Sequence, residues 1–139
     1  MTNYETHDAT APDSGYALGG IRQTLRLEGL AVLVISVASY WQLDGNWWWF
    51  FGLLLWPDLA FFAYIKSSRM GAQIYNMLHS YIGPLAIGLT GSLAGQQALI
   101  LFALIWTAHI GMDRFVGYGL KYPEQPDVTH LGLKGKSAN

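Results

Sequence analysis

The chain has 139 residues, the length of one domain, and 52% of them are hydrophobic while only 12% are charged. A soluble domain has about 25% charged residues, and a chain this short cannot bury so many apolar groups in water. The net charge of −1 gives no reason to expect a nucleic-acid partner, and without cysteine there is no disulfide, thiolate metal site or cysteine nucleophile. The composition therefore predicts the lipid bilayer as the partner of the apolar side chains.

The first segment is polar and acidic. Residues 1–19 lack the basic start and the continuous apolar core that a cleavable signal peptide needs. We expect a disordered cytoplasmic tail over 1–19, a membrane domain with an ordered C-terminal segment over 20–132, and a flexible tail over 133–139.

Four apolar segments follow, each long enough to cross a bilayer as a helix, which takes about 20 residues. They span residues 21–43, 47–64, 72–89 and 96–116. The turns between them are short, so neighbouring helices should be antiparallel. The predicted fold is all-α, an integral membrane up-and-down bundle of four transmembrane helices.

The basic residues predict the orientation of this bundle. All eight lysines and arginines fall on the side that holds the two termini, and the turns at 44–46 and 90–95 hold none. Because basic residues accumulate on the cytoplasmic side of a membrane, both termini should be cytoplasmic. Three or five spans would scatter these charges, so the pattern also favours four.

Ionisable side chains within the spans gather in the cytoplasmic half. At about 1.5 Å per residue, Asp58 should lie about 12 Å, His79 about 15 Å and His109 about 10 Å from the inner surface. Asp113 follows His109 by one helical turn and shares its face. Ionisable groups are costly in a membrane and usually functional there. We predict a shared catalytic site of these four residues; the alternative is a hydrogen-bond network that only fixes helix register.

Four further side chains near this level are candidates for substrate binding. They are Tyr75, Asn76, Arg114 and Lys121. Each also has a structural interpretation: Arg114 as an anchor that reaches the headgroups, and Asn76 as a hydrogen-bonding contact between helices.

After the last span, the stretch GYGLKYPEQPDVTHLG is rich in glycine and proline, which favours an ordered turn over a helix. We expect it to fold back over the cytoplasmic end of the bundle and to bring His130 towards His109 and Asp113.

Two or three imidazoles with one or two carboxylates suit zinc or non-haem iron. The predicted metal ligands are His79, His109, Asp113 and His130. A metal-bound water that ionises at about pH 7 would hydrolyse a lipid-like or amphipathic substrate from the inner leaflet. The chain has no HExxH or ExxH motif, so the pattern is not specific by itself.

Three other functions remain open. Asp58, His79 and His109 would serve as the relay of a proton-coupled transporter, for which four helices suffice only in a homo-oligomer. A haem held by His79 and His109 would leave the carboxylates and Arg114 unexplained. The last alternative is a non-catalytic membrane accessory subunit.

Six short blocks carry a family resemblance. They are LRLEGL (25–30), PDL (57–59), YNMLHSY (75–81), AHIGMDR (108–114), GYGLKYP (117–123) and THLG (129–132). Together they resemble the bacterial family described as domain of unknown function 4260, over residues 25–132. The resemblance implies a small multi-pass protein of the bacterial inner membrane without an established activity. Its motif positions fall on Glu28, Asp58, Tyr75, Asn76, His79, His109, Asp113, Arg114, Tyr118, Lys121 and His130.

Overall fold

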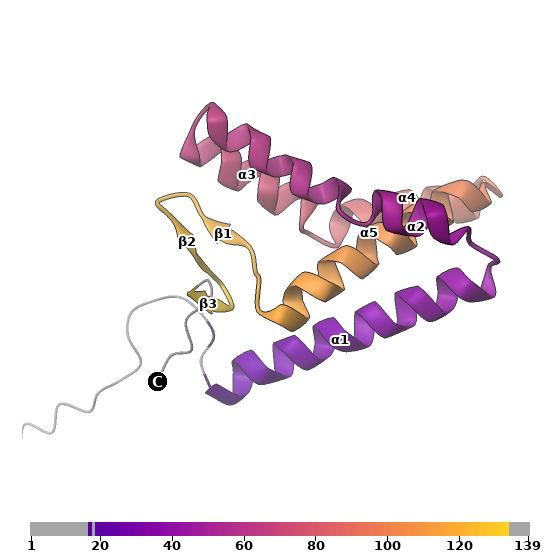
Figure 1. Ribbon diagram of the computed structural model, residues 1–139, viewed down its shortest axis with the longest axis horizontal. Helices are drawn as coiled ribbons and strands as arrows, with labels where there is room; N and C mark the ends of the chain where they lie inside the picture. Colours follow the sequence, from indigo (N-terminus) through magenta and orange to yellow (C-terminus); the bar gives the residue numbers. More distant parts are fainter. Residues whose placement is uncertain (1–16, 18, 134–139) are drawn as a thin grey trace, which may run out of the picture.

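The computed structural model of the chain describes residues 17 and 19–133, so the tails expected at 1–19 and 133–139 fall largely outside the described residues. The described chain is mostly helical (Figure 1). Its helices are α1 (Gly19–Gln42), α2 (Trp47–Leu53), the 3₁₀ helix η1 (Trp56–Ile65), α3 (Ser68–Leu78), α4 (Ile82–Leu93) and α5 (Gln97–Val116). Among the described residues, three helical segments are long and apolar enough to cross a membrane: Gly19–Gln42, Trp47–Ile65 and Gln97–Val116.

The second apolar segment changes its helix type near Pro57. The α-helical part ends at Leu53 and η1 begins at Trp56, because proline has no amide hydrogen with which to continue the α-helix. The amide of Asp58 then donates to the Leu55 carbonyl at 3.1 Å, which is 3₁₀ pairing. As a result the carbonyl of Leu54 loses the partner that an α-helix would give it.

The third apolar segment is two helices, where the sequence predicts one over 72–89. α3 ends at Leu78, α4 begins at Ile82, and residues 79–81 form a break between them. Ser80 Oγ accepts a hydrogen bond of 3.2 Å from the amide of Ile82, a local bond that competes with helical pairing. Pro84 is tolerated because it lies in the first turn of α4.

α1 and α5 pack closely against each other, and α4 packs on α5 as well (Figure 1). α1 and α5 approach each other closely at two glycines. A methyl group at Gly111 would lie 2.8 Å from both the carbonyl oxygen of Gly29 and the amide nitrogen of Leu33. Small residues allow membrane helices to approach in this way.

This contact predicts a stability effect. Gly111→Ala should destabilise the protein by about 1–3 kcal/mol, because the added methyl group meets backbone that cannot move aside. Gly52→Ala is the matched control, since a methyl group there would meet no atom beyond the adjacent residues and the nearby backbone of its own helix within 4 Å. Reversible unfolding in mixed detergent micelles measures both variants. Equal stability of the two variants would contradict the close approach of α1 and α5.

α3 packs mainly against η1, and this pair touches the group formed by α1, α4 and α5 at few places. Figure 1 shows α3 diverging from α1 at one end of the molecule. The seam between the two groups runs past the end of α3 and the C-terminal part of α5.

The C-terminal segment forms a small antiparallel sheet, which corrects the all-α prediction. Its strands are β1 (Lys121–Tyr122), β2 (Gln125–Thr129) and β3 (Gly132–Leu133), in the order β1-β2-β3. The chain leaves α5 at Gly117, whose φ of 102° ends the helix in the left-handed conformation. The ordered, non-helical segment predicted after the last span is therefore present, as a sheet beside α3 (Figure 1).

Candidate functional site

Four ionisable side chains meet at the seam between the two helix groups. Asp58 comes from η1, His79 follows the last residue of α3, and His109 and Asp113 come from α5. One ligating atom of each lies within 4.8 Å of those of the other three. The structure thus brings together the four residues that the sequence places in one site, while their catalytic role stays a prediction.

The two imidazoles face each other between the two carboxylates. His79 Nε2 and His109 Nε2 are 3.1 Å apart. Asp58 Oδ1 lies 3.4 Å from the first nitrogen and 3.5 Å from the second, and Asp113 Oδ2 lies at 3.4 and 3.6 Å. Both imidazoles are buried, whereas the Asp113 side chain is 14% exposed and that of Asp58 is 36% exposed.

The nitrogen–nitrogen separation and the four nitrogen–oxygen separations are close to the edges of a metal coordination tetrahedron. Zinc lies about 2.0–2.2 Å from imidazole nitrogens and carboxylate oxygens, so neighbouring ligand atoms are about 3.4 Å apart. The nitrogen–oxygen separations of 3.4 to 3.6 Å are too long for good hydrogen bonds. A divalent ion would satisfy both imidazole nitrogens and neutralise both carboxylates, which would move towards each other to bind it. The 3.1 Å between the nitrogens leaves no room for a porphyrin between the two rings.

His79 is held so that Nε2 points into the cluster. Its Nδ1 lies 2.9 Å from the carbonyl oxygen of Tyr75, and its ring stacks on the Tyr75 ring with centroids 3.7 Å apart. A ligand histidine normally donates its other N–H in this way, which fixes the tautomer and frees the facing nitrogen. The break after α3 also exposes the His79 carbonyl, which accepts a bond of 3.0 Å from Arg114.

His109 lies close to the point where the second segment changes its helix type. The backbone of Leu54, whose carbonyl is left without a helical partner there, is near the imidazole, but the buried Nδ1 makes no hydrogen bond among the described residues. The same change places Asp58 in the first turn of η1, beside His109.

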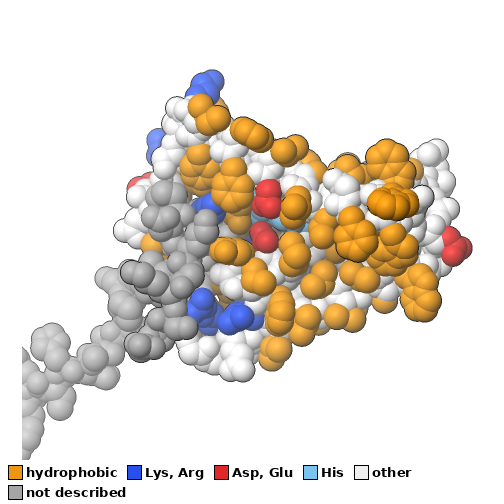
Figure 2. Space-filling view, in the orientation of Figure 1, with side chains coloured by type: hydrophobic (Ala, Val, Ile, Leu, Met, Phe, Trp, Pro, Cys, Tyr) orange, Lys and Arg blue, Asp and Glu red, His pale blue; other side chains and the backbone are white. Residues whose placement is uncertain are grey.

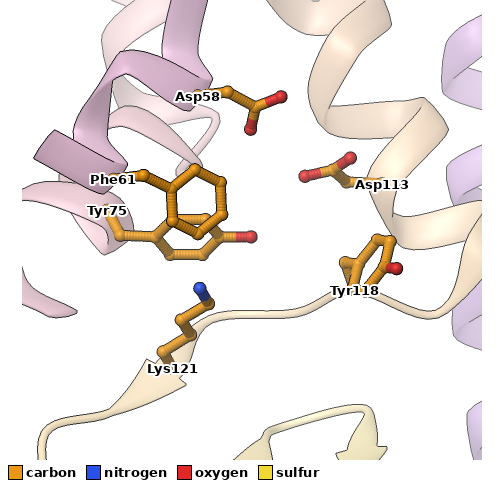
Figure 3. Close-up of a pocket in the computed structure, with 6 residues that line it drawn as sticks. All are labelled: Asp58, Phe61, Tyr75, Asp113, Tyr118 and Lys121. Carbon is orange, nitrogen blue, oxygen red and sulfur yellow. The ribbon is translucent and has the colours of Figure 1, made fainter. Parts of the chain in front are cut away.

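A pocket of about 200 Å³ opens beside the cluster. Figure 3 shows the carboxylates of Asp58 and Asp113 on one side of it, the hydroxyl of Tyr75 pointing into it, and Lys121 reaching up from β1. The Lys121 Nζ lies 4.0 Å from the ring centroid of Tyr75 and 4.3 Å from that of Phe61. Both distances are within cation–π range.

Asn76 and Arg114 contact the backbone around the pocket. The Asn76 side chain accepts from the amide of Lys121 at 2.7 Å and donates to its carbonyl at 2.8 Å, so it holds β1 against α3. Arg114 donates to the carbonyls of His79, at 3.0 Å, and Tyr118, at 3.3 Å. Of the four residues predicted to bind substrate, Tyr75 and Lys121 line the pocket. Asn76 and Arg114 do not line it, but they bind the backbone of residues around it.

His130 is not brought to this cluster. Its Nδ1 accepts a hydrogen bond of 2.9 Å from the amide of Leu120, and burial, together with the charge of Arg114, lowers its pKa. Asp58 supplies the fourth ligating atom instead. The turn-rich sequence indicated that the segment folds back, but not which backbone amide the imidazole would meet.

Phe61 and Tyr118 also line the pocket and were not among the predicted site residues. In a 3₁₀ helix, side chains three residues apart eclipse, so Phe61 lies on the same face as Asp58. That signal is visible only once the helix type is known. Tyr118 lies just after α5. Its place in the block GYGLKYP, which resembles the family, was the feature of the sequence that could have identified it as a site residue.

The site opens on an apolar face. In Figure 2, acidic side chains and part of a histidine are visible in the middle of a surface of hydrophobic side chains. On this face the polar cluster is therefore bordered by apolar surface.

Comparison with known proteins identifies a family but no activity. No curated protein and no solved structure matches the chain. One family model, described as Domain of unknown function (DUF4260), matches residues 22–133, a range that contains the whole cluster and its pocket. The chain therefore belongs to the DUF4260 family.

Proposed function

We propose that this protein is a metal-dependent membrane hydrolase that acts on an amphipathic substrate from the inner leaflet. The observation that carries the proposal is the set of four ligating atoms within 4.8 Å of one another, next to a pocket. Zinc is the preferred ion, and iron suits the same ligands.

The proposed topology has four spans, with the third made of two helices. At about 1.5 Å per residue, the 11 residues of α3 extend about 16 Å and the 12 residues of α4 about 18 Å. Placed end to end, the two helices are long enough to cross a core of about 30 Å. A break at membrane depth is tolerated where it faces protein or a cavity, and residues 79–81 lie beside the cluster. Both termini are then cytoplasmic, and the protein resides in the bacterial inner membrane.

Reporter fusions test this topology. Fusions after Asn46 and after Ser92 should report the external side, and fusions after Ser68 and at the C-terminus the cytoplasmic side, because the basic residues remain inside. A cytoplasmic signal at Ser92 would contradict the third span.

The proposed chemistry divides the four ligands. Without substrate, all four side chains would hold the ion. With substrate, His79, His109 and Asp113 would keep it and water would replace the more exposed Asp58, as an open catalytic site requires. The ion would supply a water with a pKa of about 7 as the nucleophile for the ester. The released Asp58 carboxylate accepts the proton of this water and passes it to the leaving alcohol as the ester bond breaks.

Lys121 and the size of the pocket bear on the substrate. The ammonium of Lys121 faces the carboxylates across the pocket (Figure 3), where it stabilises negative charge that develops on the ester oxygen. A pocket of about 200 Å³ is smaller than the about 300–1,000 Å³ of sites that enclose a whole drug-sized ligand. It takes the ester and headgroup while the apolar part of the substrate stays in the bilayer.

Lipid hydrolysis is the test. Zinc-loaded protein in micelles with a phospholipid extract should release fatty acid or headgroup, detected by mass spectrometry, and a chelator should stop the release. Lys121→Met should lower the rate about 100- to 1,000-fold, the usual cost of a lost oxyanion contact, at unchanged metal content. Lys66→Met, at an exposed position, is the control. Metal-loaded protein that releases nothing, or release that survives the chelator, would contradict the hydrolase.

One observation favours a second candidate. The 3.1 Å between the two imidazole nitrogens is also a distance at which they share a proton, as in the relay of a proton-coupled transporter. Such a transporter would require a homo-oligomer for alternating access. Proton uptake into proteoliposomes by metal-free protein would favour it over the hydrolase.

A further inference from the structure

A second, larger pocket of about 590 Å³ lies between α1, the C-terminal part of α5, the break after α3 and the C-terminal sheet. It shares no lining residue with the pocket beside the His/Asp cluster. One wall is the apolar face of α1, with Leu25, Gly29 and Val32 along it. These residues are spaced at helical turns, so the wall runs lengthwise and suits an extended hydrocarbon chain.

Next to this wall, the pocket is lined by polar groups that carry both signs of charge. Arg114, Tyr81 and His130 line it together with the carboxylate of Glu28. Among the described residues, Glu28 and Arg114 form no ion pair with each other. Arg114 uses two of its terminal N–H groups on the carbonyls of His79 and Tyr118, and a guanidinium has five N–H donors.

We propose that this pocket binds one phospholipid whose headgroup carries a phosphate and a primary ammonium. A guanidinium matches phosphate geometry, so Arg114 and His130 receive the phosphate and Glu28 receives the ammonium. One acyl chain lies along the wall of α1. The pocket is at the cytoplasmic end of the proposed topology, where headgroups of the inner leaflet lie. This site is separate from the proposed hydrolytic pocket and does not depend on its chemistry.

A hydrogen bond links this pocket to the His/Asp cluster. The Arg114 guanidinium donates to the backbone carbonyl of His79, so a phosphate bound to Arg114 lies one hydrogen bond away from a residue of the cluster. The structure therefore joins the two pockets through one side chain, without a shared wall.

Native mass spectrometry of delipidated full-length protein tests the proposal, with phosphatidylethanolamine and phosphatidylglycerol of identical acyl chains as probes. We expect one phosphatidylethanolamine per chain, bound more tightly than phosphatidylglycerol. Leu25→Trp fills the apolar wall and should weaken binding at least about tenfold, or about 1.4 kcal/mol. Leu27→Trp is the matched control, because Leu27 is 55% exposed and lines neither pocket.

A second pair of variants tests the headgroup. Glu28→Gln should remove the preference for phosphatidylethanolamine, and His130→Asn should weaken both lipids while its side-chain oxygen keeps the bond from Leu120. Equal binding to Leu25→Trp and Leu27→Trp would mean that the lipid only coats the surface, which overturns the site. Tighter binding of phosphatidylglycerol to the parent overturns the ammonium contact. Metal content measured on the same samples separates either result from a failure of the proposed hydrolase.

Discussion

His109→Gln and Asp113→Asn are each expected to yield a folded, membrane-inserted protein that has lost its metal. Mutating a residue that only hydrogen-bonds to a metal ligand lowers metal affinity about 10- to 100-fold. Here glutamine and asparagine replace the predicted ligands themselves. The loss of affinity should therefore exceed about 100-fold. Hydrogen bonds between membrane helices are worth at most about 1.7 kcal/mol, so these polar replacements leave the bundle intact.

Two controls separate ligand loss from a general effect. Asp44→Asn makes the same chemical change at an exposed turn position with a φ of 54°, which asparagine tolerates. His130→Asn removes the imidazole that lies outside the cluster. Both proteins should keep the metal of the parent, measured by elemental analysis after purification without a chelator. Metal loss in the His130 variant would restore that residue to the ligand set and contradict the geometry described above.

Removing the ion should loosen one part of the molecule more than the rest. η1 and α3 pack on each other and touch the α1–α4–α5 group at few places, and the cluster joins the two groups. An ion present at about 1,000 times its dissociation constant stabilises the folded state by about 4.1 kcal/mol. For a domain of this size, that corresponds to a fall in melting temperature of about 10–20 °C on chelation.

Hydrogen exchange locates this effect. Amides of residues 56–78 should lose protection when the metal is removed, while those near the contact of Gly29 with Gly111 should keep it. Adding zinc back should restore both the protection and the melting temperature. A uniform loss of protection, or none, would contradict the role of the cluster as the join between the two helix groups.

The meeting of the four ionisable residues could be predicted because membrane depth restricts where such groups can point. Asp58, His79 and His109 fall at similar depths in separate segments, and lipid exposure is costly for each. The family resemblance selected the same positions independently. The roles of these residues, by contrast, depend on chemistry that a single sequence does not specify.

The break after α3 and the place of His130 could not be predicted, for different reasons. Hydropathy over 72–89 is continuous, and the break depends on the local bond from Ile82 to Ser80 and on the contact of Arg114 with the His79 carbonyl. His130 is held by the amide of Leu120 within a sheet whose strands are two to five residues long. Strands that short leave no periodic pattern in a sequence. The sequence also did not place Asp58 among the metal ligands, because its position beside His109 depends on the 3₁₀ helix that begins near Pro57.

The measurement that tests the metal centre most directly is X-ray absorption at the metal edge, made on protein purified from membranes without a chelator. We predict one zinc or iron ion per chain, with two imidazole nitrogens and two carboxylate oxygens at about 2.0–2.2 Å and no sulfur ligand. Protein that is fully folded but free of metal, or a metal whose spectrum lacks imidazole scattering, would contradict the proposed centre formed by Asp58, His79, His109 and Asp113.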